Sequence, residues 1–227
     1  MYGYIKENYE SLLAEISRLG ACAGNSVTLV AVTKSGTDEE LVALARAGAA
    51  DIGENRPQEL KRRGDLLKEC GLSPRLHEIG NLQKNKVKQI ITDVALIHSL
   101  DSLELAREID RRAEAVGRRV PVLIEINSAR ETAKGGILPE DAEEFFREVR
   151  KYPNLIVSGV MTMGPVCDDP EQMRPYFRLT KEIFEGLKTK YGFEGTPTLS
   201  MGMSDSYKVA IEEGATLVRV GRRLFQK

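Results

Sequence analysis

One lysine, Lys34, stands at the end of a strongly β-branched stretch, residues 27–37 (VTLVAVTKSGT). Such a run favours a strand buried on both faces, as in α/β proteins, and Gly36 ends it. Barrels and doubly wound sheets place their chemistry at the C-terminal ends of parallel strands. Lys34 therefore has two interpretations: a solvated charge, or a partly buried amine able to form a Schiff base with a carbonyl compound.

Small residues near the C-terminus could bind a phosphate group, because their backbone N–H groups can approach an anion closely. They are Ser200, Gly202 and Ser204 in the segment LSMGMS, and Gly221 in the segment VRVGRR. Arg222 could add a charge-assisted hydrogen bond. Barrels often bind phosphate with the loops after the seventh and eighth strands, where these residues are expected. Opposite a lysine on the first strand, the pattern predicts a phosphate site.

Arg219, near the end of the last expected strand, also has two interpretations. It could form a structural ion pair with Glu54 or Asp51, or it could face a ligand. Because arginine keeps its proton, it would hold a pyridine nitrogen unprotonated as an acceptor and so weaken the ring as an electron sink. The second interpretation suits a protein that holds a pyridine cofactor without deep carbanion chemistry.

The two histidines, His77 and His98, give a weaker signal. His77 falls inside an expected strand, where a hydrogen-bonded structural role is commoner than catalysis, and His98 has no partner in the sequence pattern. Without paired carboxylates in a helical register, two distant histidines do not indicate a metal site. The basic groups at 61–63 and 84–88 are typical of solvated helix faces and not of a nucleic-acid patch.

Strands and helices alternate along the chain and must position these residues. After an amphipathic helix at 4–19, eight strands are predicted: the Lys34 stretch, then 50–53, 75–79, 94–98, 120–126, 155–160, 198–201 and 217–220. Seven helices separate them, at 38–47, 57–69, 83–91, 102–116, 139–152, 170–191 and 205–213. Thr37 and Gly48 are the expected N-cap and stop of the first of these seven.

The strict alternation predicts the α/β class and a single (β/α)8 TIM-type barrel domain over residues 1–227, with an additional N-terminal helix. No Gly/Ser/Pro-rich linker interrupts it, so no second domain is expected. Little chain follows the last strand, which leaves the barrel without its last outer helix. The helix at 4–19 is therefore expected to cover the seam between the first and last strands.

Composition narrows the class of protein. The 227 residues are 41% hydrophobic and 30% charged, with a formal net charge of −1, which disfavours a dedicated nucleic-acid binder. No apolar run is long enough for a membrane span, and the N-terminus does not resemble a signal peptide. Three cysteines without CxxC spacing are typical of reduced thiols. We expect a soluble, cytoplasmic protein.

Several segments match one known family, in order along nearly the whole chain. They are LVAVTK (29–34), DIGENRPQEL (51–60), HEIGNLQKNKVK (77–88), HSLDS (98–102), INSARETAKGG (126–136), GVMTMGP (159–165) and LSMGMSDSYKVAIEEGATLVRVGRRLF (199–225). On these segments the chain resembles the pyridoxal phosphate homeostasis proteins, which share the barrel of the alanine racemase N-terminal domain.

The resemblance implies that pyridoxal 5′-phosphate (PLP) forms a Schiff base with Lys34 and that Arg219 contacts its pyridine nitrogen. The other implied cofactor-binding residues are a phosphate-holding set and a pocket-lining set: Ser200, Gly221 and Arg222, and Asn55, His77 and Met201. Arg222 stands where the family often has threonine, so the implied phosphate contact at this position is through the backbone.

The function implied is PLP binding in intracellular vitamin B6 homeostasis, by a monomer without strong catalysis that could pass PLP to apoenzymes. Racemases of the related fold carry a second β domain that supplies a catalytic tyrosine, and no such segment is present in this sequence. Racemisation needs acid/base groups on both faces of the substrate. The alternatives are a small PLP-dependent racemase or lyase, with His77 or Tyr207 as second base, and a cofactor-free Schiff-base aldolase.

Overall fold

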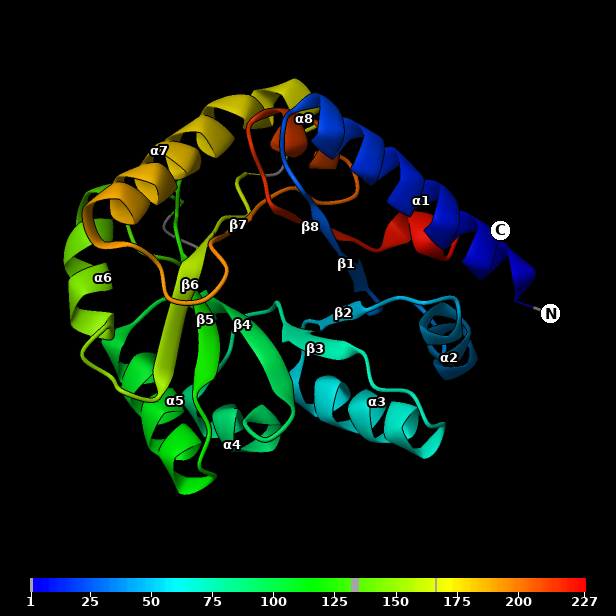
Figure 1. The fold of residues 1–227 in the computed structure, drawn as a ribbon, viewed down its shortest axis with the longest axis horizontal. Helices are drawn as coiled ribbons and strands as arrows, with labels where there is room; N and C mark the ends of the chain where they lie inside the picture. Colours follow the sequence, from blue (N-terminus) through cyan, green and yellow to red (C-terminus); the bar gives the residue numbers. More distant parts are fainter. Residues whose placement is uncertain (1, 132–134, 166) are drawn as a thin grey trace.

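The computed structural model describes residues 2–131, 135–165 and 167–227, so residues 132–134 of the INSARETAKGG segment lie outside the described residues. Figure 1 shows helices arranged around a central ring of strands. The strands form a closed parallel barrel in the order β1 to β8, and β8 pairs with β1. The predicted (β/α)8 barrel is therefore confirmed.

The strands are β1 (Thr28–Val32), β2 (Asp51–Glu54), β3 (Arg75–Glu78), β4 (Val94–Leu100), β5 (Val120–Glu125), β6 (Leu155–Met161), β7 (Thr198–Ser200) and β8 (Leu217–Val220). The helices are α1 (Gly3–Cys22), α2 (Asp38–Arg46), α3 (Pro57–Glu69), α4 (Val87–Ile90), α5 (Leu103–Ala115), α6 (Ala142–Val149), α7 (Arg174–Tyr191) and α8 (Tyr207–Glu212). Short 3₁₀ turns lie at Lys84–Lys86, Pro139–Asp141, Pro170–Met173 and Arg222–Leu224.

Three helices begin three or four residues later than predicted, because a 3₁₀ turn replaces the first turn before α4, α6 and α7. The reason is clearest at α7. An α-helix starting at Pro170 would need an N–H at residue 175 to bond to the carbonyl of Glu171, and Pro175 has none. The α-helix therefore begins at Arg174, where Pro175 falls in the first turn and its missing N–H has no cost.

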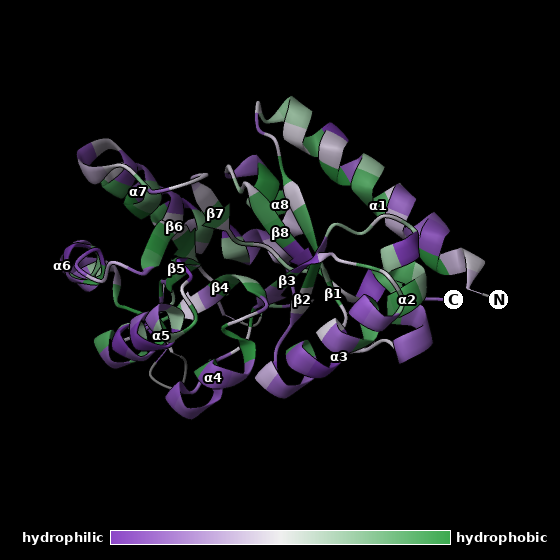
Figure 2. Cartoon of the chain, turned by 60° about the horizontal axis from the view of Figure 1, so that its bottom comes forward, coloured by the Kyte–Doolittle hydropathy of each residue, from purple (hydrophilic) through white to green (hydrophobic). Residues whose placement is uncertain are grey.

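Apolar side chains fill the layer between the strands and the helices, and a smaller apolar group lies inside the barrel. A small inner cluster consists of Val30, Leu96, Leu123, Met161 and Leu217. A much larger cluster joins the outer faces of the strands to the buried faces of the helices, and Figure 2 shows helices with their hydrophobic sides turned toward the strands. Successive strand residues alternate between the two clusters, as side-chain alternation requires.

Helix α1 covers the barrel at the β1–β8 seam, as predicted. It packs against α2, α8 and the last 3₁₀ turn, and Figure 1 shows it beside the C-terminal segment. Its own residues Ile5, Leu12 and Ile16 are fully buried. Asn8 ties it to the end of the chain by donating to the backbone carbonyl of Gln226 at 2.8 Å. The N-terminal helix thus takes the position of an outer helix at the β1–β8 seam.

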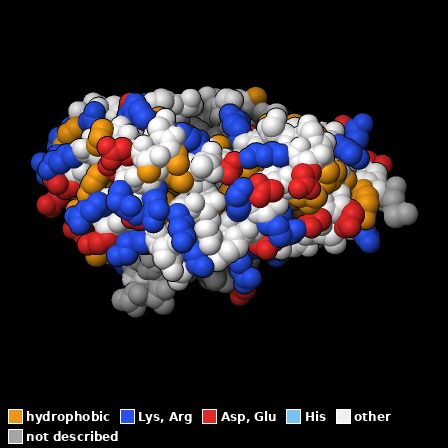
Figure 3. All heavy atoms as spheres, turned by 90° about the horizontal axis from the view of Figure 1, so that it is seen from below, with side chains coloured by type: hydrophobic (Ala, Val, Ile, Leu, Met, Phe, Trp, Pro, Cys, Tyr) orange, Lys and Arg blue, Asp and Glu red, His pale blue; other side chains and the backbone are white. Residues whose placement is uncertain are grey.

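The surface carries charges of both signs, which share the face of the molecule seen in Figure 3. Arg62 on α3 forms an exposed ion pair with Asp38. Its neighbour Arg63, predicted to be solvated, is only 7% exposed, so that prediction is wrong. Within the described ranges, no helix is both long and apolar enough to cross a membrane.

Truncating α1 at its buried face should weaken the whole barrel. We expect Leu12→Ala to lower the free energy of unfolding by about 2–5 kcal/mol, because Leu12 is fully buried against the seam. The matched control is Leu13→Ala: Leu13 is the next residue and is 37% exposed, so the loss should not exceed about 1 kcal/mol. Urea unfolding measures both, and equal losses would contradict the covering role of α1.

Candidate functional site

Lys34 lies directly after β1, in the turn 33–36 at the C-terminal end of the barrel. The N–H of Gly36 closes the turn by donating to the carbonyl of Thr33 at 2.9 Å. The Lys34 side chain is exposed, which agrees with the first interpretation, a solvated charge, and contradicts the partial burial assumed in the second. Among the described residues it has no hydrogen bond and no ion pair. An amine without a protein partner is free to react with a carbonyl compound.

The strands that flank β1 bring two of the predicted site residues to the same rim. Gly221 follows β8, and a Cβ at this position would lie 2.7 Å from the backbone oxygen of Val32. Only glycine allows the chain to pass so close to the end of β1. Asn55 follows β2, is half-buried, and its side chain has no partner in the described part of the chain. Gly221 and Asn55 thus lie on either side of the Lys34 turn.

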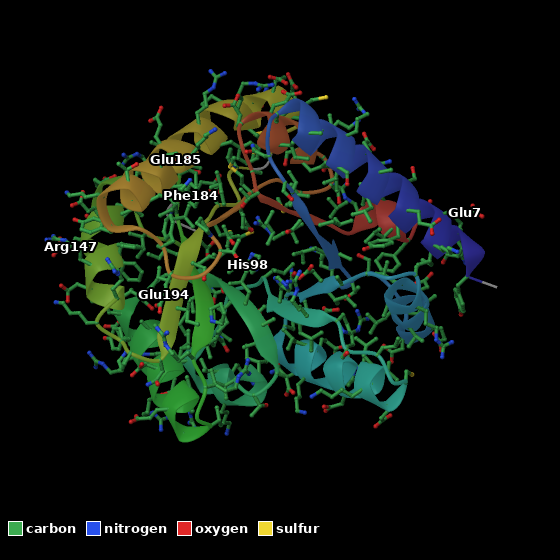
Figure 4. All side chains as sticks on the ribbon, in the orientation of Figure 1. Glu7, His98, Arg147, Phe184, Glu185 and Glu194 are labelled. Atoms are coloured by element: carbon green, nitrogen blue, oxygen red, sulfur yellow. The ribbon has the colours of Figure 1, made fainter. Side chains whose placement is uncertain are left out.

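A chain of hydrogen bonds crosses the barrel interior from β2 to β8. Asp51 Oδ1 lies 2.8 Å from His77 Nε2, and His77 Nδ1 lies 2.9 Å from His98 Nε2. His98 Nδ1 lies 3.0 Å from Ser200 Oγ, to which Arg219 Nη1 donates at 2.5 Å. All five residues are at most 4% exposed, and Figure 4 shows His98 in the middle of the ring of strands. We call these five residues the interior chain.

The two ends of the interior chain set its direction, because Arg219 can only donate and an ionised Asp51 can only accept. Burial opposes ionisation of Asp51, but its hydrogen bonds to His77 and Arg75 keep its pKa below the ordinary value. One arrangement then satisfies every member: Ser200 donates to His98 Nδ1, His98 Nε2–H to His77 Nδ1, and His77 Nε2–H to Asp51. The Ser200 hydroxyl is therefore already used within the protein.

The interior chain gives His98 a partner on each side, which sequence analysis did not find. Burial lowers the pKa of His98 well below its ordinary value, and His77 and Arg219 act in the same direction, so the ring is neutral. A signal was present in the sequence, since His77 and His98 lie on neighbouring strands. The register pairs His77 with Leu96, and His98, two residues further along, faces the same side.

Arg219 is a buried cation without a carboxylate partner in the described residues. Its Nη2 donates to the backbone oxygen of Thr162 at 3.0 Å, and its Nη1 donates to Ser200. Burial lowers the pKa of Arg219 to about 10, although Glu125 acts in the opposite direction. Two of the five N–H donors of the guanidinium make these bonds, which leaves donors for a further acceptor.

The alternative ion pairs of Arg219 are wrong, because both candidate carboxylates have other partners. Glu54 accepts from Arg63 Nη1 at 2.6 Å, on the outer side of the barrel. Asp51 pairs with Arg75 at 2.6 Å as well as with His77. The ion pair of Arg219 with Glu54 or Asp51 is therefore excluded, and its contact with a ligand stays a prediction.

Two other predicted residues lie away from the mouth of the barrel. Met201 is fully buried and packs in the cluster between the strands and the helices. Arg222 is exposed and pairs with the exposed Asp205. The backbone N–H of Gly221 donates to Ser204 Oγ at 3.3 Å, which joins the two loops predicted to bind phosphate.

Tyr207, considered as a second base, lies outside the barrel. It is 2% exposed, belongs to α8, and accepts a hydrogen bond from Arg223. Burial and its hydrogen bond to Glu15 raise the pKa of Tyr207 to about 12. The other candidate, His77, has both ring nitrogens engaged in the interior chain. Neither residue is therefore an available base at the rim that carries Lys34.

Two carboxyls lie side by side on the outer face of the barrel, since Glu54 and Glu78 are partners in the β2–β3 register. Glu78 is fully buried, and its Oε1 accepts from the N–H of Gly80 at 3.1 Å, whereas its Oε2 has no partner among the described residues. Burial, and then the proximity of Glu54, raise the pKa of Glu78 to about 8. Glu78 is thus mainly protonated at neutral pH and can coexist with Glu54.

Comparison with known proteins identifies the family of this chain. The family described as "Alanine racemase, N-terminal domain" matches residues 8–226. A pyridoxal phosphate homeostasis protein of Aquifex aeolicus (strain VF5) is 41% identical over 222 residues, which cover 96% of each chain. The protein of the same name from Helicobacter pylori (strain ATCC 700392 / 26695) is 34% identical over 226 residues, or 98% of each chain.

Solved structures agree with the sequence matches. The structure of PipY from Synechococcus elongatus PCC7942 with PLP bound has a TM-score of 0.85 and 27% identity, and covers 98% of this chain and 100% of PipY. The alanine racemase of Clostridium difficile 630 in complex with cycloserine has a TM-score of 0.72. At 17% identity it shows the fold alone, and the similarity covers only 59% of the racemase chain.

Removing the Ser200 hydroxyl from the interior chain should destabilise the fold. We expect Ser200→Ala to lower the free energy of unfolding by about 1–3 kcal/mol, because His98 Nδ1 and one N–H of Arg219 lose a buried partner. Ser35→Ala, at an exposed position, should change it by no more than about 0.5 kcal/mol. Chemical denaturation of both variants tests this, and the idea fails if their midpoints coincide.

Glu78 should make the protein less stable as the pH rises. Its folded pKa of about 8 exceeds the ordinary value of 4.5, so the folded state holds more protons between these values. Stability due to Glu78 is full below pH 4.5 and is lost toward pH 8, by up to about 1.4 kcal/mol per pH unit. Glu78→Gln cannot ionise at this position. The difference between its unfolding free energy and that of the wild type should therefore increase in favour of the variant as the pH rises from 4.5 to 8.

The control for Glu78 is Glu39→Gln, which changes an exposed carboxyl on α2. Urea unfolding of the wild type and both variants from pH 5 to 9 is the measurement. Glu39→Gln should run parallel to the wild type, while Glu78→Gln diverges upward. A Glu78→Gln curve that stays parallel would show that Glu78 is ionised in the folded protein.

Proposed function

The chain belongs to the alanine racemase N-terminal domain family and to the pyridoxal phosphate homeostasis proteins, and from this premise we propose that it holds PLP as a Schiff base on Lys34. Its role is PLP homeostasis, as in the relatives that carry this name. PLP binding to a protein of this fold is stated for PipY, which aligns over 98% of the present chain.

The observation that carries the proposal is that the barrel has both a free amine, Lys34, and a buried cation, Arg219. Lys34 is exposed and has no partner among the described residues, and Arg219 is buried without a carboxylate. When bound, PLP supplies an aldehyde for the amine and a pyridine nitrogen that can accept a hydrogen bond from Arg219. The residues present therefore fit the cofactor at both of its ends.

Arg219 and the interior chain would orient the cofactor. A guanidinium retains its proton and leaves the pyridine nitrogen as an acceptor, which limits electron withdrawal by the ring. Ser200 and Thr162 fix the guanidinium from two sides. The phosphate would lie at the loop containing Gly221, with Asn55 across the Lys34 turn. This division of roles favours binding over chemistry at the amino-acid substrate.

The weak catalysis that we propose follows from the acid/base groups. Racemisation needs a base on each face of the substrate, and Lys34 can serve only one. His77 is engaged in the interior chain and Tyr207 lies on the outer side of the barrel. A racemase or lyase would have to find its second base elsewhere, so the carrier function is favoured.

The proposal extends to partners and location. Apoenzymes that need PLP are the proposed acceptors, because an exposed Lys34 leaves the attached cofactor within reach of another molecule. A closed barrel has no free strand edge for pairing with a second copy, which supports a monomer. Cys22, Cys70 and Cys167 are free thiols, which are typical of the reducing cytoplasm.

The test of the proposal is an absorbance spectrum with added PLP, followed by borohydride reduction and peptide mass spectrometry. The wild type should show the band of a lysine-bound PLP and carry the reduced adduct on Lys34. Lys34→Ala should lose both and keep its unfolding free energy within about 0.5 kcal/mol, since the side chain is exposed. The control is Lys84→Ala, at another exposed lysine, which should behave like the wild type.

Two outcomes would contradict the proposal. An adduct that persists in Lys34→Ala would place the attachment on another lysine. A wild type that forms no adduct at saturating PLP would exclude the Schiff base itself and leave the cofactor-free aldolase as the function to test.

A further inference from the structure

Arg63 on α3 makes three hydrogen bonds in a buried position. Its Nη1 donates to the backbone oxygen of Thr33 and to Glu54 Oε1, both at 2.6 Å. Its Nη2 donates to the backbone oxygen of Gly36 at 2.7 Å. Thr33 and Gly36 are the first and last residues of the turn that carries Lys34. A single guanidinium therefore binds both ends of this turn.

The fork geometry of arginine suits this contact. The guanidinium is planar, and its N–H groups point in fixed directions, so two carbonyl oxygens bound to it are held at a fixed separation. A lysine has a single ammonium on a flexible stem and cannot reproduce this arrangement. The contact thus fixes the backbone on both sides of Lys34 and leaves the Lys34 side chain free.

Glu54 holds Arg63 in place. It is 3% exposed, and the same oxygen, Oε1, also accepts from the hydroxyl of Thr33. The other carboxylates near Arg63, on Asp38 and Glu59, lie 3.7 Å from its Nε, and this atom has no hydrogen-bond partner in the described residues. The close partners of Arg63 are therefore Glu54 and the two carbonyls of the turn.

Packing alone does not require an arginine at this position. Leu60 and Leu67, one turn before and after Arg63, are buried on the same face of α3 with 1% exposure each. An apolar residue at 63 would continue this stripe, and well-packed apolar residues often replace a buried ion pair without loss. The bonds to the turn are what an apolar residue could not make.

We propose that Arg63, held by Glu54, is a positioning residue for Lys34. By fixing the turn 33–36 it fixes the backbone position from which the Lys34 side chain extends toward the aldehyde of PLP. The inference rests on the proposed function, because it assigns a role in attachment at that site. It concerns how the chain orients its lysine, and Arg63 itself does not touch the cofactor.

The experiment compares variants that keep or remove the two-carbonyl contact. Arg63→Lys keeps the charge and loses the fork, whereas Arg63→Met combined with Glu54→Gln removes both buried charges, so that neither is left unpaired. The matched control is Arg62→Lys, at the preceding residue, whose side chain is exposed and pairs with Asp38 and Glu59. Far-ultraviolet circular dichroism and thermal unfolding establish that each variant is folded.

The first measurement is the rate at which the Lys34 adduct forms after PLP is added, from aliquots trapped with borohydride and analysed by mass spectrometry. We expect both Arg63 variants to form it at least about tenfold more slowly than the wild type, since small displacements of a reacting group have effects of this size. Arg62→Lys should keep the wild-type rate. A purely structural role would lower the unfolding temperature and leave this rate unchanged.

The second measurement needs no cofactor. Hydrogen exchange of the Gly36 amide, which closes the turn by bonding to Thr33, should be faster in both Arg63 variants and unchanged in Arg62→Lys. Folded Arg63 variants with wild-type exchange and wild-type trapping rates would overturn the inference. If the wild type forms no adduct on Lys34, the proposed function fails, and unchanged exchange would then separately overturn the contact with the turn.

Discussion

The parallel pairing of β1 with β8 is the constraint on which the rest of the site depends. It joins residues from opposite ends of the sequence, with Val30 beside Arg219 and Ala31 beside Val220. Because every strand is parallel, closure also gathers all eight C-terminal strand ends on one rim. A shift of one residue in this pairing would turn Arg219 out of the interior and separate it from Ser200. Helix α1, packed along the seam, stabilises this register.

Five buried polar residues share the barrel interior with a small apolar cluster, and their hydrogen bonding explains how their burial is tolerated. A buried polar group without a partner is costly, whereas a fully satisfied chain rigidifies its surroundings. The interior chain ends in a carboxylate on one side and a guanidinium on the other, with two imidazoles and a hydroxyl between them. The same bonds that offset burial also hold the guanidinium of Arg219 in one orientation.

The sequence predicts the architecture well, because alternation of strand and helix depends on local periodicity and on caps such as Thr37. It locates Lys34, Asn55, Arg219 and Gly221 on the correct elements. The sequence is less informative about which side of the barrel a residue faces. Met201, for example, faces outward and packs between the strands and the helices. The partner of His98 comes from another strand.

Arg63 shows the same limit at a helix. Its neighbours Lys61 and Arg62 are charged, so composition indicates a solvated face. Its spacing from Leu60 and Leu67, three before and four after, nevertheless puts it on the buried stripe of α3. Helical periodicity therefore predicts that Arg63 is buried, whereas the neighbouring charges suggest that it is exposed. Periodicity cannot predict the hydrogen-bond acceptors of Arg63, because Thr33, Gly36 and Glu54 come close to it only in the tertiary fold.

The contacts of Arg63 fix the backbone of the turn 33–36 while the Lys34 side chain remains free. An exposed lysine without a partner keeps its rotamer freedom, and ordering it has an entropic cost when it reacts. The protein does not restrain the side chain itself, which must remain available. It fixes the backbone that carries the side chain, through Arg63 on the outer side of the barrel, while the interior chain fixes Arg219 on the inner side. In the proposed function, two rigid supports on opposite faces of adjacent strands thus frame a site whose reactive group stays mobile.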